Sequence, residues 1–172
     1  MDYTYMPPAK LTRMAEAVVA ELNKGKVFAD DTLIKVKKAY IDPYSDAFLV
    51  DVELDSVSVK REASWNTDGD DESPTSVDED LTYEYSESDD IKKAFKTTEA
   101  TILGHKVYLL LDECTAEKVD TTDWTIEHSS EEDAGIGSYE FWGEVGYDSR
   151  PYMHYEGTIT EEFVVWATLE IE

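Results

Sequence analysis

The chain has 172 residues, of which 41% are hydrophobic and 12% aromatic, and its formal net charge is −25. This length fits one domain that buries a real core, and the aromatic content argues against general disorder. The charge disfavours binding of nucleic acid through its phosphates and binding to anionic membranes, because the basic footprint of such proteins is missing.

Cysteine usage and the N-terminus exclude further classes. Cys114 is the only cysteine, so no internal disulfide is available, which suits a reducing compartment. The first eight residues have neither a basic region nor an apolar run, and we therefore expect no signal peptide. No stretch approaches the roughly 18 apolar residues of a membrane span, so we expect a protein without a membrane partner.

The first predicted element is an amphipathic helix over residues 10–24. Apolar residues recur there at steps of three and four and form one stripe, with Gly25 as the expected left-handed residue after the helix. Residues 33–41 then alternate as a strand, and a turn follows at residues 42–46. Residues 48–59 predict a second strand, whose apolar phase shifts near Ser56 and indicates a bulge or bend.

Residues 66–90 form an acidic stretch without any Lys or Arg. Its bland interpretation is a long solvated loop or insertion, because charge-rich segments without periodicity rarely form regular structure. The sharper interpretation is an acidic surface that repels DNA or faces a partner. The residues chosen for that surface are Asp68, Asp70, Asp71, Glu72, Asp78, Glu79 and Asp80.

The second half of the chain is harder to assign. Residues 100–111 are rich in strand formers, with a turn expected at Gly104 and His105, whereas residues 107–119 fit either a strand or a helix. Residues 131–135 predict a loop, and residues 149–151 a turn. The last predicted element is the most regular strand of the chain, residues 163–171. Every second residue in it is apolar, so the apolar residues share one face.

The closing strand has a second face that is half apolar, because Val164 and Trp166 share it. Such a face needs a cover, either from this chain or from a neighbouring subunit. Together with Tyr40, these two residues are the candidate subunit interface. Trp166 fits equally well as an ordinary core residue.

No residue pattern in the sequence indicates catalysis or a bound cofactor. The three histidines lie in unrelated contexts, and no close pair with zinc-ligand spacing occurs. Phosphate-binding loops, dinucleotide fingerprints and nucleophile elbows are also missing from the sequence. We therefore expect no catalytic, cofactor-binding or metal-binding residues, although abundant carboxylates leave a small carboxylate-based enzyme as a third alternative.

Charge is distributed unevenly along the chain. Residues 1–40 carry seven Lys or Arg and five Asp or Glu, a net charge of +2, so the remaining residues carry −27. Such polarity suits assembly between copies of the chain. The acidic stretch 66–90 has a further alternative as a DNA mimic, in which spaced carboxylates imitate a phosphate backbone and occupy a basic protein.

Three places together resemble small neck and tail-completion proteins of long-tailed bacteriophages, of the tail-terminator type. These are the helix at residues 11–23, the segment from Val36 through the Asp42-Pro43 turn into residues 48–59, and the closing strand 163–171. The resemblance implies an α+β fold: a mainly antiparallel or mixed sheet flanked by the N-terminal helix and one further helix near residues 107–119.

The resemblance also implies a function without catalysis. Proteins of this type form a ring, often a hexamer, that caps the tail tube and joins it to the head connector. We therefore expect residues 1–172 to be a single domain of a virion protein assembled in the host cytoplasm. Its expected partners are its own copies, the tail-tube protein, head connector proteins and passing DNA that is not held tightly. The alternative is an acidic DNA-mimic inhibitor of a host nuclease, restriction or CRISPR system.

Overall fold

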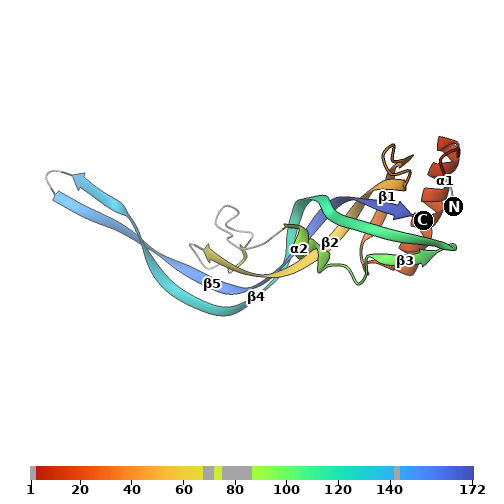
Figure 1. Ribbon diagram of the computed structural model, residues 1–172. Coiled ribbons are helices and arrows are strands. Elements are labelled where there is room, and N and C mark those ends of the chain that lie inside the picture. Colours follow the sequence, from red (N-terminus) through yellow and green to blue (C-terminus); the bar gives the residue numbers. More distant parts are fainter. Residues whose placement is uncertain (1–2, 68–71, 75–86, 142–143) are drawn as a thin grey trace. The chain divides into compact units, whose positions relative to one another are not determined.

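The computed structural model describes residues 3–67, 72–74, 87–141 and 144–172. Its fold is α+β, as the sequence predicts: an N-terminal helix, a small second helix and one five-stranded antiparallel sheet in the order β1-β2-β5-β4-β3 (Figure 1). The elements are α1 (Pro8–Gly25), β1 (Leu33–Ile41), β2 (Phe48–Thr67), α2 (Glu87–Lys92), β3 (Glu99–Ile102), β4 (His105–Phe141) and β5 (Glu144–Ile171).

Helix α1 forms where the apolar stripe predicts it and packs against β1 and β3 (Figure 1). Proline is favourable in the first turn because its missing N–H has no helical partner there. The stripe is buried through Leu11, Ala15, Val18, Val19 and Leu22. The left-handed residue is Lys26, with φ 47°, rather than the expected Gly25, because the helix continues through the glycine.

Strands β1 and β2 form the predicted hairpin. Their register pairs Ile41 with Phe48 and Val36 with Val52, and it shifts by a bulge between Val36 and Lys38. The turn is built on Asp42, whose carboxylate accepts hydrogen bonds from the Tyr44 amide at 3.1 Å and the Ser45 hydroxyl at 2.7 Å. Both donors, Ser45 first, lower the pKa of the Asp42 carboxyl, since they stabilise its charged form.

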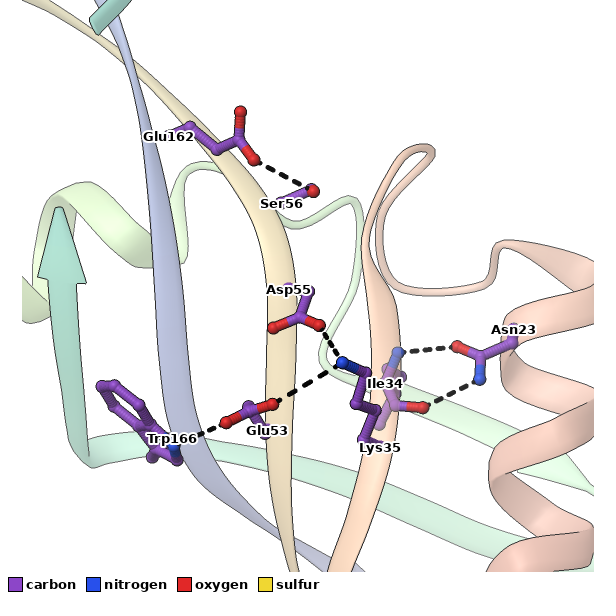
Figure 2. A network of polar contacts seen from close by, with 8 residues as sticks. All are labelled: Asn23, Ile34, Lys35, Glu53, Asp55, Ser56, Glu162 and Trp166. Carbon is purple, nitrogen blue, oxygen red and sulfur yellow. Dashed lines mark hydrogen bonds and ion pairs between the residues drawn. The ribbon is translucent and has the colours of Figure 1, made fainter. Parts of the chain in front are cut away.

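The predicted phase shift in β2 is confirmed. Up to Leu54, the buried residues of β2 are the even-numbered ones from Phe48 onward. After Ser56, the buried residues are odd-numbered, beginning with Val57 and Val59. Ser56 lies between the two phases with φ 60°, a left-handed conformation that inserts the extra residue. Its hydroxyl donates to Glu162 of β5 at 3.1 Å, which fixes the bend to the neighbouring strand (Figure 2).

The ambiguous segment 107–119 is a strand within β4, so the helix implied there by the resemblance is wrong. Strands β3 and β4 form a hairpin in which Ile102 pairs with His105. The turn is Leu103-Gly104, one residue earlier than expected, and both residues have positive φ, at 51° and 81°. This matches the tight turn that antiparallel strands favour. The loop expected at 131–135 and the turn expected at 149–151 are also wrong, because β4 and β5 run through them.

The chain divides into two compact units. Unit 1 comprises residues 1–59, 85–120 and 161–172, and unit 2 comprises residues 60–84 and 121–160. The expectation of a single domain over residues 1–172 stays a prediction. Of the predicted acidic loop 66–90, the structure describes residues 66–67 at the end of β2, residues 72–74, and residues 87–90 in α2.

Each unit has its own core. In unit 1, the buried stripe of α1 packs on apolar residues of β2, β4 and β5, including Val50, Leu109 and Val165. In unit 2, Trp65 and Tyr155 lie with ring centroids 5.9 Å apart, and Ala63 and Ile159 complete the cluster. The two cores depend on residues that are distant in sequence, which is why strand periodicity alone does not separate them.

Candidate functional site

The face of the unit 1 sheet that does not contact α1 combines aromatic, apolar and acidic side chains. Side chains alternate along a strand, so burying Val50 and Val52 beneath α1 turns Asp51 and Glu53 to the other side. The same alternation in β5 places Trp166 and Thr168 there. We call this surface the open face; its members are Tyr40 of β1, Leu49, Asp51 and Glu53 of β2, Leu110 of β4, and Trp166 and Thr168 of β5.

Asp51 is the polar centre of the open face. Its Oδ1 accepts a hydrogen bond from the Tyr40 hydroxyl at 3.1 Å and another from the Thr168 hydroxyl at 3.3 Å. These contacts link β1, β2 and β5 across the sheet. Partial burial, followed by the hydrogen bond to Asp51 and the charge of Asp51, raises the pKa of Tyr40, because a phenolate next to a carboxylate is unfavourable.

Glu53 holds the indole of Trp166. Its Oε1 accepts a hydrogen bond from Trp166 Nε1 at 3.2 Å, and its Oε2 lies 3.9 Å from Lys35 Nζ (Figure 2). Lys35 also pairs with Asp55, which raises the pKa of the lysine by stabilising its charged form. The indole nitrogen is thus satisfied within the chain, while 36% of the Trp166 surface stays exposed.

A hollow of about 740 Å³ lies on the open face. Its aromatic and apolar lining includes Tyr40, Leu49, Trp166 and Leu110, of which Leu110 is 42% exposed. Large apolar side chains gathered on an exposed surface are typical of interaction sites, because leaving them in water is unfavourable.

The hollow is also acidic. Among the described residues, three carboxylates line it, Asp51, Asp112 and Glu113, against one cation, Lys37. Asp112 forms an ion pair with Lys92 at 2.6 Å, and this contact lowers the pKa of Asp112. A surface on which aromatic rings lie beside carboxylates favours the binding of positively charged groups. We call this place the acidic hollow.

The structure brings together two of the three predicted interface residues. Tyr40 and Trp166 line the acidic hollow. Val164 lies two residues before Trp166 on β5 and is half-buried. The sequence did not indicate Leu49 and Leu110: Leu49 is an apolar residue on a strand face that otherwise carries Asp51, Glu53 and Asp55, and Leu110 falls in the ambiguous segment 107–119.

The predicted acidic surface is described at only one of its seven residues. Glu72 is exposed, and its backbone carbonyl accepts a hydrogen bond from the Trp65 indole at 2.9 Å. The other six lie outside the described residues: Asp68, Asp70, Asp71, Asp78, Glu79 and Asp80. Their role as a DNA-repelling or partner-facing surface stays a prediction.

A smaller hollow of about 360 Å³ lies in unit 2, lined by His128, His154 and Glu156 together with two serines. His154 Nδ1 is 2.6 Å from the Asn66 amide oxygen, and its Nε2 is 3.5 Å from Glu156. Within the part of the chain that the structure describes, no group of three or more His, Cys, Asp or Glu side chains has the geometry of a metal site. Our expectation that the protein is not an enzyme and holds no cofactor stays a prediction.

None of the helices among the described residues is sufficiently long and apolar to cross a membrane. Comparison of the chain with protein-family models, with curated proteins and with solved structures found no match.

Proposed function

We propose that this chain is a non-enzymatic structural protein of a phage particle, which forms a ring at the head-proximal end of the tail. The observation that carries the proposal is the open face. Trp166, Tyr40 and Leu110 gather beside a hollow that no described helix or strand covers, on the face of the sheet opposite the one that α1 covers. A neighbouring subunit that packs on this surface removes its apolar side chains from water.

The charge supports the same proposal. Genomic DNA has to pass through a ring in this position without binding tightly. A net charge of −25 repels the phosphate backbone, so an acidic lumen lets DNA slide. The partners would be further copies of the chain, in a hexamer or another closed ring, with the tail-tube protein on one side and head connector proteins on the other. The protein would be assembled in the host cytoplasm and remain in the virion.

The experiment compares two variants that each replace an exposed aromatic residue with an acid. Trp166→Glu places a charge on the open face, whereas the control Tyr44→Glu places one in the β1–β2 turn, where the tyrosine is 96% exposed. We expect wild type and Tyr44→Glu to form the same ring by sedimentation velocity. Trp166→Glu should sediment as a monomer that retains a cooperative melt. If Trp166→Glu simply unfolds, Trp166 is core rather than interface.

A second candidate is an acidic DNA-mimic inhibitor, favoured by the total charge and by the carboxylates of the acidic hollow. Its partner would be the basic cleft of a host nuclease, restriction or CRISPR protein. A monomer or dimer that binds such a nuclease, with affinity falling steeply as salt rises, supports this candidate and contradicts the ring.

A further inference from the structure

The N-terminal end of α1 is a basic surface. Lys10 and Arg13 are exposed there, and the first turn contains no acidic residue. The residue before the helix, Pro7, provides no side-chain cap, so the positive end of the helix dipole adds to the two cations. Among the described residues, no carboxylate forms an ion pair with either side chain. The acids of the helix begin further along, at Glu16. We call Lys10, Arg13 and this first turn the basic end of α1.

The acidic hollow presents the opposite charge with unused hydrogen-bonding capacity. Both hydrogen bonds to Asp51 fall on Oδ1, so in the described structure Oδ2 is open to a further donor. Glu113 has no ion-pair partner among the described residues. The exposed ring of Trp166 lies beside these carboxylates. An arginine fits such a place because its guanidinium stacks on aromatic rings and donates to carboxylates in a fork.

The basic end and the acidic hollow belong to opposite sides of unit 1. Helix α1 packs on the buried face of the sheet, through Leu11 and Val18, while the hollow lies on the open face. Two complementary surfaces on opposite sides cannot satisfy one another within one unit. They can meet between two copies, and a contact between two different surfaces repeats head to tail until the assembly closes.

We propose that the acidic hollow of one copy receives Lys10 and Arg13 from the α1 helix of the next copy. Arg13 stacks on Trp166 and donates to the carboxylates of the hollow, and Lys10 adds a second charged contact at its rim. The proposal rests on the proposed ring, for which it names the surfaces that adjoining subunits use. It explains why the chain combines a net positive N-terminal part with a strongly acidic remainder.

Charge reversal tests this pairing. The helix variant Lys10→Glu/Arg13→Glu and the hollow variant Asp112→Lys/Glu113→Lys should each weaken self-association about tenfold or more, as expected for removing close charge pairs across an interface. The matched control is Lys24→Glu/Lys26→Glu, which reverses the same number of charges at the other end of α1 and should assemble like wild type. Circular dichroism melts of all variants check that each remains folded.

Mixing the two reversed proteins gives the decisive result. The reversed helix of one fits the reversed hollow of the other, and the native surfaces that remain also fit, so an equimolar mixture should assemble at concentrations where neither protein does alone. Sedimentation velocity of the mixture measures this. The pairing is wrong if the helix variant assembles like wild type, or if the mixture stays dissociated. A wild-type chain that stays monomeric at every concentration overturns the proposed ring itself, which distinguishes the two failures.

Discussion

The side chain of Asn23 provides a prediction about how α1 is fastened to the sheet. Its Nδ2 donates to the Ile34 carbonyl at 2.9 Å, and its Oδ1 accepts from the Ile34 amide at 2.9 Å (Figure 2). Strand β1 is an edge of the sheet, so these backbone groups have no further strand to pair with. Asn23 therefore completes the hydrogen bonding of the sheet edge and joins it to the last turn of the helix.

Replacing Asn23 with alanine removes both bonds at once. A hydrogen bond contributes about 0.5–1.5 kcal/mol net, so two give about 1–3 kcal/mol. Alanine is the better helix former by at most about 0.7 kcal/mol, which offsets part of this loss. The result should be a lower free energy of unfolding of unit 1, measured by urea denaturation, together with faster hydrogen exchange of the Ile34 amide.

The control for this prediction is Lys24→Ala, which shortens the next side chain in the same turn. Lys24 is exposed, and we expect its replacement to change stability by no more than about 0.5 kcal/mol. If Asn23→Ala unfolds at the same urea concentration as wild type and the Ile34 amide exchanges at the same rate, the two hydrogen bonds do not fasten the helix to the sheet edge.

Two further predictions concern close packing and titration. A side chain at Gly157 would bring its Cβ into collision with the Thr125 carbonyl oxygen, so Gly157→Ala should destabilise unit 2 by about 1–3 kcal/mol in thermal melts; an unchanged melt contradicts this close approach. Asp51→Asn should lower the raised pKa of Tyr40 towards its ordinary 10.0, observed by NMR of the tyrosine ring, and an unchanged pKa means that Asp51 contributes nothing to the shift. The stability linked to this raised pKa is fully present below about pH 10 and is lost as pH rises through the folded value.

The sequence predicted those elements whose own residues show which side is buried. Helix α1 and strand β1 follow from a single apolar stripe and a clear alternation, and the phase shift at Ser56 is visible because apolar residues change parity there. Strand β4 lacks such a signal, since its residues from 112 to 120 are mostly exposed and show no alternation. This segment is a strand because it pairs with β5 in the sheet, and its own sequence pattern does not predict that.

The candidate site was predictable in part for the same reason. Trp166 is marked without knowledge of the fold, because it is a large residue on the half-apolar second face of the closing strand, and Tyr40 is a large aromatic residue near the end of the first predicted strand. Leu110 and the carboxylates beside it join the acidic hollow only because β4 pairs next to β5 in the sheet. That arrangement depends on contacts between residues more than fifty positions apart, and periodicity carries no information about it.

In the proposed ring, the open face joins copies of this chain. Its most direct test is the mass of the wild-type protein over a concentration series, measured by sedimentation velocity and accompanied by negative-stain images. We expect one closed assembly of defined mass, with annular particles that dissociate when Trp166 is replaced by glutamate. A monomer of 19.5 kDa at every concentration contradicts it.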